Sequence, residues 1–320
     1  MNKNRLIEKL RNEINAEIKN NLKKFCDVPL SEEMLSYQIG LSKAKEVQGK
    51  RFRPILCLLS SMAISGNYKK ALPAAAAIEL VHNFSLIHDD IQDEDRFRRG
   101  RMTVWKKWNK NQAINAGDAM HTISNLALNR MFELNLPVSV ISSVSSVVNF
   151  SCYQMCEGQM LDCSFEKRKT VTVNEYMKMI AKKTAALIES AAHAGASTAT
   201  KNQKTIRHFK NFGFNLGMAF QIFNDISGFD GTRERFTHFK SDIEKNKKSL
   251  PVILALKNTD KSNINPKKMF ELIRRSGTIE KSRKIGEVYL AKAIQELDKA
   301  GVKNRAIDLL KEYVSKIKEV

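Results

Sequence analysis

Hydrophobic residues recur along this chain at the spacing of α-helices. Near the start they stand three or four positions apart, at Leu6, Ile7, Leu10, Ile14, Ile18 and Leu22, which places them on one helix face. The same spacing returns over residues 176–187 and 307–317. Residues 72–87 and 210–226 are apolar nearly all round, as is typical of helices buried inside a bundle. No segment alternates clearly and no hairpin signal is present, so the pattern predicts an all-α fold of roughly ten or more helices.

The breaks between these segments predict short loops and a single domain. Prolines are few, and none lies between Pro137 and Pro251, so little in that interval forces a helix to end. Loops are predicted at 48–49, 66–69, 94–102, 167–173, 228–248 and 258–266. No low-complexity linker divides the chain. We therefore expect one all-helical domain over residues 1–320.

Composition adds a preference for anionic partners. The 320 residues are 42% hydrophobic and carry a net charge of +20, which suits phosphorylated metabolites, nucleic acid or anionic lipid. The five cysteines form neither a secreted disulfide framework nor a zinc module. The first residues do not resemble a secretory signal, and no apolar run reaches the ~18–20 residues of a membrane span. We expect a cytoplasmic protein with at most peripheral membrane contact.

Three carboxylates crowd one end of the apolar segment 72–87, in the run His88-Asp89-Asp90-Ile91-Gln92-Asp93. Asp89 and Asp93 are four positions apart and share a helix face. Like charges at that spacing destabilise a helix by roughly 0.2–0.5 kcal/mol. A divalent cation bound between them would remove this repulsion, so the pair favours cation binding. Magnesium takes one or two carboxylates and completes its coordination with water and substrate phosphate. The alternative is a solvated acidic helix end.

Two basic clusters accompany the acidic one. Gly49-Lys50-Arg51-Phe52-Arg53-Pro54 precedes a predicted helix, whose N-terminus favours anions. Arg98-Arg99-Gly100 follows the aspartates, and arginine can bind phosphate in a bidentate way. The alternatives are a solvated basic loop and local salt bridges to the aspartates, and surface pairs of that kind contribute only ~0–1 kcal/mol.

A second apolar helix ends in similar chemistry, at Phe220-Gln221-Ile222-Phe223-Asn224-Asp225. Two such ends facing each other would form a divalent-metal clamp, because bundles build metal sites from facing helices. Lys183 lies within a helical segment, and His82 lies two turns before Asp90. By residue type alone, the lysine is as readily a surface group, and His82 is more often a core or surface histidine than a ligand.

Taken in order, these segments resemble the trans-prenyl diphosphate synthases of the polyprenyl synthetase family, and in particular archaeal-type geranylgeranyl diphosphate synthases. The resemblance runs from about Gly49 to Pro251. Its motifs are Gly49-Lys50-x-x-Arg53-Pro54, Asp89-Asp90-x-x-Asp93 with Arg98-Arg99-Gly100, Ala116-Gly117-Asp118, Gly158-Gln159, Lys183-Thr184, Phe220-Gln221 and Asn246-Lys247-x-Ser249. Agreement of the whole set in chain order makes the resemblance specific.

The resemblance implies an isoprenoid-synthase-type helical bundle around a central cavity, a homodimer, and roughly two or three Mg²⁺ ions. The implied reaction joins isopentenyl diphosphate head to tail with an allylic diphosphate, giving geranylgeranyl (C20) or farnesyl (C15) diphosphate. The implied metal ligands are Asp89, Asp93 and Asp225, and the implied catalytic set adds Asp90, Lys183 and Gln221. Isopentenyl diphosphate would be bound by Lys50, Arg53, His82 and Arg99, and the allylic diphosphate by Arg98, Lys183 and Lys247, with Thr184 and Gln221 lining the reacting centre.

Product length is predicted to be a matter of packing. Helix rise is ~1.5 Å per residue, so Phe84 lies ~7–8 Å before Asp89 along the axis. A ring there would stop the growing tail, and the archaeal-type resemblance includes an aromatic residue at this position. Phe84 and its neighbour Ser85 are therefore predicted to determine chain length. The alternative is that Phe84 is an ordinary core aromatic.

The second acidic motif departs from the family pattern of two aspartates plus one. It reads Asn224-Asp225-Ile226-Ser227-Gly228, and the family's lysine after it falls on Thr237. An amide oxygen is a weaker magnesium ligand than a carboxylate. We therefore expect Asp225, helped by Asp230, to sustain this metal site.

Other functions remain open to sequence reasoning: a longer-chain polyprenyl synthase, a class I terpene cyclase, a non-catalytic regulatory subunit and a nucleic-acid binder. A cyclase would not need a second diphosphate site at 49–54, and the intact first acidic motif argues against a regulatory subunit. Nucleic-acid binding explains the +20 charge but not the acidic clusters, and no base-reading module is recognisable. We therefore expect no nucleic-acid partner.

Overall fold

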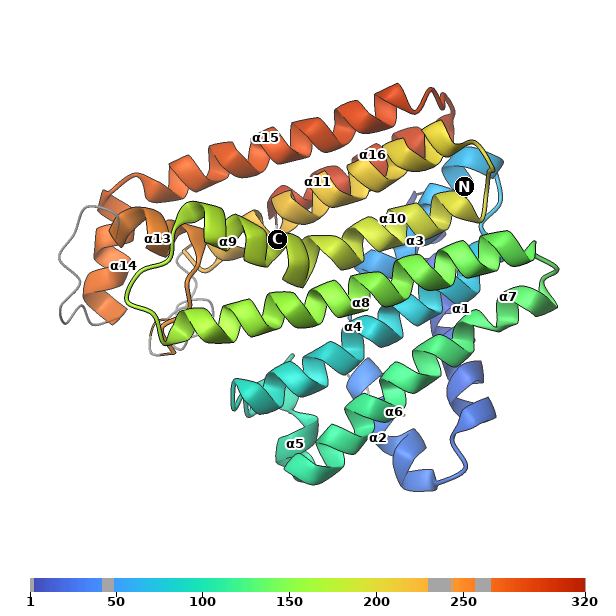
Figure 1. Ribbon diagram of the computed structural model, residues 1–320, viewed down its shortest axis with the longest axis horizontal. Coiled ribbons are helices and arrows are strands. Elements are labelled where there is room, and N and C mark those ends of the chain that lie inside the picture. The colour runs from blue at the N-terminus through green and yellow to red at the C-terminus, as the bar shows by residue number, and fades with distance from the viewer. Residues whose placement is uncertain (1–2, 42–48, 230–242, 244, 257–265, 320) are drawn as a thin grey trace. The chain divides into compact units, whose positions relative to one another are not determined.

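The computed structural model describes residues 3–41, 49–229, 243, 245–256 and 266–319, and it confirms the all-α prediction (Figure 1). The helical elements are, in chain order, α1 (Lys3–Phe25), α2 (Pro29–Ile39), α3 (Phe52–Ser65), η1 (Lys69–Ala71), α4 (Leu72–Gln92), α5 (Val104–Lys107), α6 (Lys110–Leu128), α7 (Arg130–Glu133), α8 (Val138–Glu166), α9 (Val173–Ile180), η2 (Ala181–Ala185), α10 (Ala186–Ser197), α11 (Gln203–Ser227), α13 (Leu250–Leu256), α14 (Pro266–Arg275), α15 (Thr278–Lys299), α16 (Arg305–Ser315) and η3 (Lys316–Glu319). Among them, η2 is a π-helical turn.

The chain forms two compact units. Unit 1 comprises Met1–Asn149, Ser190–Ile206 and Asn304–Ile307, and unit 2 comprises Phe150–Glu189, Arg207–Lys303 and Asp308–Val320. The boundaries between them fall within α8, α10, α11 and α16 and just before α16. The single domain expected over residues 1–320 stays a prediction.

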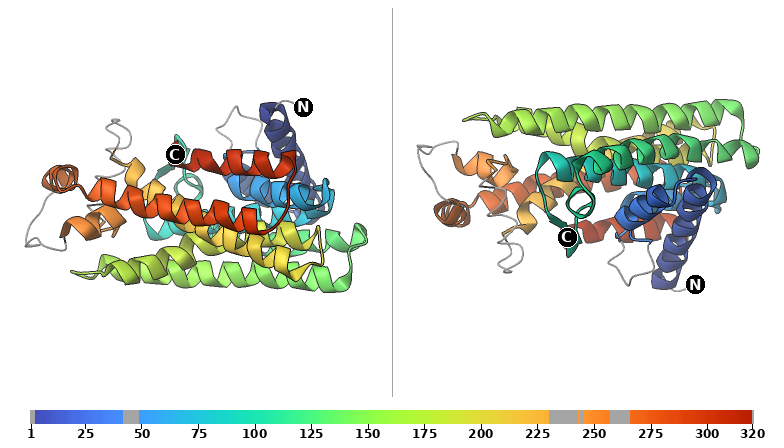
Figure 2. Two further views of the ribbon diagram at one scale, coloured as in Figure 1. Left: turned by 90° about the horizontal axis from the view of Figure 1, so that it is seen from above. Right: turned by 90° about the horizontal axis from the view of Figure 1, so that it is seen from below.

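Unit 1 is built around α4, whose residues 72–81 are buried throughout, as expected for a helix that is apolar nearly all round. Helix α6 lies alongside α4 (Figure 1), and α1, α2 and α3 also contact it. The predicted stripe of α1 faces inward, since Leu10, Ile14 and Ile18 are completely buried. Helix α1 crosses α3 and α4 steeply (Figure 2). Helix α4 is therefore packed on several sides, which fixes the position of its C-terminal end.

Unit 2 contains most of α11, where Phe209, Phe212 and Leu216 are completely buried. A second apolar cluster consists of Phe229, Val252, Ala255, Met269 and Ile273. It joins α13 to α14, and α13 also contacts α9 and α15. This packing anchors α13, whose first residue contacts the acidic end of α11.

A small hairpin corrects the reading of residues 94–102 as a plain loop. Strand β1 (Phe97–Arg98) pairs antiparallel with β2 (Arg101–Met102). The two turn residues, Arg99 and Gly100, have φ of 54° and 78°, and a two-residue type I′ turn needs positive φ at both positions. The prediction that no hairpin is present was wrong, because two-residue strands are too short to alternate and arginine stands where Asn or Asp usually signals such a turn.

Other sequence-based expectations can be compared directly. No helix among the described residues is long and apolar enough to cross a membrane. The five cysteines are free thiols. The loop predicted at 167–173 separates α8 from α9. Most of the loops predicted at 228–248 and 258–266 lie outside the described residues.

Candidate active site

The C-terminal end of α4 carries the predicted acidic cluster. Asp93 is the C-cap, and its backbone N–H donates to the Asp89 carbonyl oxygen at 2.8 Å. Asp89 and Asp93 are therefore on one face of a continuous helical turn, as predicted. The last carbonyl groups of a helix carry partial negative charge, which adds to the carboxylates. Such an end favours a cation.

Asp90 has a different environment from its neighbours. Its side chain is 1% exposed, and its Oδ1 accepts hydrogen bonds from Arg98 Nε at 2.7 Å and Nη2 at 2.6 Å. Burial raises the pKa of Asp90 to about 6, although Arg98 opposes the shift. The Arg98 guanidinium also lies 3.8 Å from Asp89 Oδ2. Arg98 thus fastens the hairpin to α4, while its predicted contact with an allylic diphosphate stays a prediction.

Basic side chains from three segments of unit 1 converge beside this end of the hairpin. Arg53 Nη1 lies 3.4 Å from His82 Nε2. A Cβ added to Gly49 would lie 2.8 Å from Arg99 Nη1, so Arg99 reaches the backbone just before the exposed Lys50. The four residues predicted to bind isopentenyl diphosphate are thus in one neighbourhood.

The pKa shifts indicate that these charges repel one another. Burial lowers the pKa of Arg53 to about 10, and Arg99 lowers it further. Burial also lowers the pKa of Arg99, with further lowering by Arg51 and Arg98. Burial and then these arginines hold the pKa of His82 well below its usual value, so His82 is neutral. A bound anion would relieve this repulsion.

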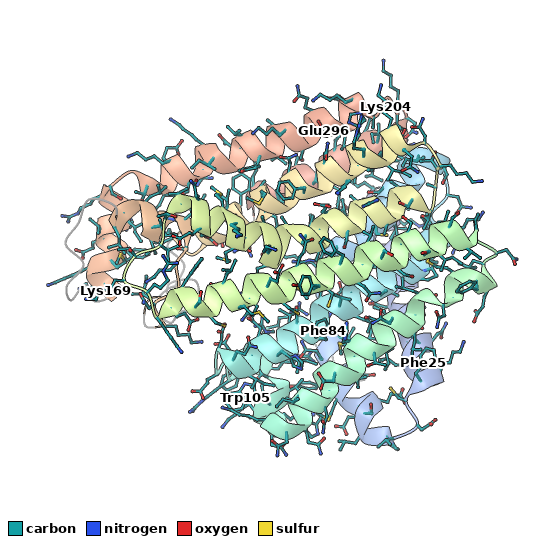
Figure 3. The ribbon with its side chains drawn as sticks, viewed as in Figure 1. Phe25, Phe84, Trp105, Lys169, Lys204 and Glu296 are labelled. Atoms are coloured by element: carbon teal, nitrogen blue, oxygen red, sulfur yellow. The ribbon has the colours of Figure 1, made fainter. Side chains whose placement is uncertain are left out.

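The ring of Phe84, which is labelled in Figure 3, packs against two histidines. Its centroid lies 5.8 Å from that of His88 and 4.9 Å from that of His121 on α6. Gly117 makes this possible, because a Cβ there would lie 2.1 Å from His88 Nε2. Ser85 donates to the carbonyl oxygen of residue 82 at 2.8 Å. Sequence reasoning missed His121, since helical spacing alone does not say which face of α6 meets Phe84.

In unit 2, Asp225 is held by three hydrogen bonds. Tyr176 Oη and the Leu250 backbone N–H donate to Oδ2 at 2.6 and 2.9 Å, and Gln221 Nε2 donates to Oδ1 at 2.8 Å. Burial raises the pKa of Asp225, while the three donors lower it. These bonds connect α9, α11 and α13. A carboxylate has about four lone-pair positions, so the donors do not exhaust it, and its role as a metal ligand stays a prediction.

The two lysines predicted to hold the allylic diphosphate meet at a carboxylate that sequence reasoning missed. Lys183 Nζ and Lys247 Nζ lie 2.6 and 3.4 Å from Asp162 Oδ2. Lys247 Nζ also lies 2.8 Å from Glu166 Oε1. Burial raises the pKa of Asp162, but the two lysines outweigh this effect and hold it below its usual value. Asp162 lies one helical turn after Gly158, so the Gly158-Gln159 motif marks the helix face on which it stands.

The π-helical turn η2 carries Lys183 and Thr184. A Cβ on Gly158 of α8 would lie 2.2 Å from Lys183 N, and one on Gly217 of α11 would lie 2.5 Å from Ala185 Cα. The turn is thus packed at backbone distance between two helices, and π-helical turns are frequent at functional sites. Thr184 Oγ1 donates to Gln221 Oε1 at 2.8 Å, which forms a hydrogen-bonded chain from Thr184 through Gln221 to Asp225.

The donor set of α4 fits a magnesium ion. The described residues contain no group of three His, Cys, Asp or Glu side chains able to hold a metal by themselves. Magnesium needs only one or two protein carboxylates when phosphate and water fill its other positions, and Asp89 and Asp93 supply such a pair. Asp230 and Thr237 lie outside the described residues.

The family model described as polyprenyl synthetase matches residues 37–317. The chain is 38% identical over 217 residues to a geranylgeranyl diphosphate synthase of Methanosarcina mazei, covering 68% of this chain and 66% of that protein. It is 41% identical over 209 residues to one of Saccharolobus solfataricus, covering 65% and 63%. The matched part therefore spans just under two thirds of these relatives.

Solved structures match over nearly the whole chain. A geranylgeranyl pyrophosphate synthetase of Pyrococcus horikoshii has a TM-score of 0.87 and 31% identity, covering 98% of this chain and 97% of that one. A synthetase of the same name from Geoglobus acetivorans has a TM-score of 0.85 and 30% identity, covering 98% and 100%. The predicted isoprenoid-synthase-type helical fold is confirmed.

Proposed function

Because the chain belongs to the polyprenyl synthetase family, we propose that it is a trans-prenyl diphosphate synthase, a prenyltransferase that joins isopentenyl diphosphate to an allylic diphosphate. The observation that carries this proposal is the presence of two groups of basic residues, one in each unit. One consists of Lys50, Arg53, His82 and Arg99 in unit 1, and the other of Lys183 and Lys247 in unit 2. A condensation of two diphosphates needs two anion sites, whereas a cyclase needs one.

Isopentenyl diphosphate takes the unit 1 cluster in this proposal. The mutual repulsion that lowers the pKa of Arg53 and Arg99 favours an anionic partner. The neutral imidazole of His82, next to Arg53, supplies a hydrogen-bonding group that adds no further positive charge.

The allylic diphosphate takes Lys183 and Lys247, with Arg98 as a further contact. Asp89 and Asp93, together with Asp225, hold Mg²⁺, with roughly two or three ions bound. When bound, magnesium neutralises the charge that develops on the leaving diphosphate. The acidic end of α4 binds that cation because two carboxylates and the negative end of the helix dipole coincide there.

The reaction begins when the carbon–oxygen bond of the allylic diphosphate breaks, with the electron pair leaving on the diphosphate. The ammonium groups of Lys183 and Lys247 stabilise that leaving group. Thr184 and Gln221 present side-chain dipoles to the allylic cation. The double bond of isopentenyl diphosphate then attacks the cation, and loss of a proton to a basic oxygen restores a double bond.

Chain length is limited in this proposal by Phe84, with Ser85 beside it. The Phe84 ring is 7% exposed and is packed by His88 and His121, so it does not turn aside easily for a longer tail. We propose geranylgeranyl diphosphate (C20) as the product, with farnesyl diphosphate (C15) as the shorter alternative.

We also propose a homodimer that uses α8. Within unit 2 this helix leaves Phe150, Tyr153 and Met160 exposed by 61%, 58% and 69%. Tyr153 and Met160 are seven positions apart and Phe150 three before Tyr153, so the three gather on one side of the helix. Exposed apolar patches of this kind favour an interface. Light scattering after size-exclusion chromatography gives the mass directly, and a monomer at micromolar concentration would exclude the dimer.

The enzyme assignment is tested by incubating the protein with Mg²⁺ and labelled isopentenyl diphosphate, with and without geranyl diphosphate. We expect labelled prenyl diphosphate only when both substrates are present. A hydrocarbon formed from the allylic diphosphate alone would indicate a cyclase, and no turnover of either substrate would contradict the proposal. The Asp225→Ala variant should need more Mg²⁺, and full activity at unchanged metal affinity would remove Asp225 from the ligand set.

A further inference from the structure

Arg51 stands between two residues proposed to bind phosphate, yet its own side chain is only 2% exposed. Its Nε donates to Asn15 Oδ1 at 2.9 Å, its Nη1 to Glu79 Oε1 at 3.0 Å, and its Nη2 to the Ile39 carbonyl oxygen at 2.7 Å. Its backbone φ is 54°, in the left-handed region that a non-glycine residue adopts at a cost. Three side-chain hydrogen bonds therefore anchor segment 49–53 at Arg51.

Its partner Glu79 connects this segment to α4. Glu79 is 2% exposed and lies one helical turn before His82. Its Oε1 also accepts a hydrogen bond from Asn83 Nδ2 at 3.0 Å. The negative charge of Glu79 opposes the lowering of pKa at both Arg53 and Arg99. One carboxylate thus holds Arg51 in place and offsets the charge of the cluster.

Gly49 extends the same arrangement to the hairpin. A Cβ there would lie 3.0 Å from Arg51 Nη1 and 2.8 Å from Arg99 Nη1. The two guanidinium groups therefore border the same backbone position, one buried and paired with Glu79, the other proposed to contact substrate. A shift of Arg51 would move Gly49. The backbone against which Arg99 packs and the backbone of Lys50 would then move as well.

We propose that the buried Arg51–Glu79 ion pair is the positioning unit of the isopentenyl diphosphate site, an inference that rests on the proposed function. The pair touches no substrate and acts by holding Lys50 and Arg53 in register with His82 on α4. A buried ion pair is a weak source of stability, because apolar residues of similar volume often replace one without loss. Its value here is geometric.

The direction in which Glu79→Gln changes the KM for isopentenyl diphosphate distinguishes a positioning role from simple charge compensation. Glu79→Gln keeps the shape and removes the charge, so the site becomes more positive. If Glu79 only offset charge, isopentenyl diphosphate would bind more tightly. If the pair positions the site, the KM for isopentenyl diphosphate should rise about tenfold, while kcat and the KM for geranyl diphosphate change less than about threefold. Arg51→Lys, which keeps the charge but loses the planar fork, should show the same split.

Glu17→Gln is the matched control. Glu17 is also a buried carboxylate of unit 1, 4% exposed, and it pairs with Arg130 of α7. Losing its charge should lower the melting temperature in the same way as Glu79→Gln but leave both KM values unchanged. The double variant Arg51→Met/Glu79→Leu should regain thermal stability and still show the raised KM for isopentenyl diphosphate.

Three results would overturn the positioning role: a lower KM for isopentenyl diphosphate in Glu79→Gln, an unchanged one, or an equal rise for both substrates. Calorimetric binding of isopentenyl diphosphate alone repeats the comparison without turnover. An inactive wild-type protein that binds isopentenyl diphosphate, with binding weakened about tenfold by Glu79→Gln, would contradict the proposed reaction and leave the positioning role standing. The two ideas therefore fail separately.

Discussion

Replacing Gly158 by alanine is expected to displace the turn that carries Lys183. The added Cβ would lie 2.2 Å from Lys183 N, 2.5 Å from Lys183 Cα and 2.8 Å from Lys182 C. All three are backbone atoms, so no side chain can turn aside. Ordinary contacts between such atoms are ~3.5–4.0 Å. The π-helical turn or α8 must therefore move by about 1 Å or more.

The magnitude follows from two opposing effects. Alanine gains ~1 kcal/mol over glycine in a helix interior, and overpacking typically costs ~1–3 kcal/mol and sometimes more. Three backbone contacts below 3 Å put this site at the upper end of the overpacking range. The net decrease in the free energy of unfolding should therefore be roughly 2 kcal/mol. At ~2.1 cal/mol/K per residue, the unfolding entropy of 320 residues is about 0.7 kcal/mol/K, so the melting temperature should fall by about 3 °C. Because a 1 Å misplacement can cost about 100-fold in rate, kcat/KM for the allylic diphosphate should fall at least tenfold.

Thermal denaturation and steady-state kinetics check both parts, with Gly286→Ala as the matched control. Gly286 also lies within a helix of unit 2, but its Cβ would meet the Phe223 ring at 3.1 Å and Ile222 Cγ2 at 3.2 Å. These are side-chain atoms that can move, so this variant should melt within about 1 °C of the wild type with unchanged kcat/KM. A Gly158→Ala protein that melts and turns over like the wild type would refute the reasoning.

Three further outcomes are expected. Phe84→Ala should shift the product toward longer prenyl chains on chromatography of labelled products, and an unchanged distribution would remove Phe84 as the length limit. Asp89→Asn should raise the Mg²⁺ concentration for half-maximal activity by about tenfold or more, and an unchanged requirement would exclude it as a ligand. Glu296 (Figure 3) accepts hydrogen bonds from His208 and Lys299 at 2.9 and 3.0 Å; burial raises its pKa, but these donors outweigh burial and hold it at about 2. This stabilisation is present above the ordinary pKa of 4.5 and is lost as the pH falls toward 2. Glu296→Gln should therefore lower the free energy of unfolding in urea at pH 7 by about 1 kcal/mol, because solvent screens these contacts near the protein surface, but not near pH 2. An equal loss at both pH values would refute this.

Much of the fold could be predicted from periodicity because burial and helical spacing are local properties. The stripe at Leu10, Ile14 and Ile18 is buried as expected, and residues 72–81 are buried on all sides. The hairpin at 97–102 could not be predicted in this way. It depends on positive φ at Arg99 and Gly100, and arginine gives no signal for such a turn.

The candidate site could be predicted only where the interacting residues are close together in the sequence. The spacing of Asp89 and Asp93 fixes their common face. By contrast, Arg51 appears in the sequence as one more cation of a basic loop. Its burial could not be predicted, because it depends on an ion pair with Glu79, which stands 28 positions away. Asp162 was missed for the same reason: its partner Lys247 comes from 85 positions later. Long-range pairs of this kind have no periodic signature.

The irregular turn η2 has a consequence for the chain as a whole. A π-helical turn accommodates more residues than an α-helical one, so removing a single residue such as Lys182 would let 173–197 run as one uninterrupted α-helix. The five residues of η2 cover about the rotation of four α-helical residues, so α9 and α10 would keep their faces and only the turn that carries Lys183 and Thr184 would change. Under the proposed function, loss of one codon there should lower turnover of the allylic diphosphate, because Lys183 and Thr184 would leave their present positions, while the circular dichroism spectrum stays almost unchanged.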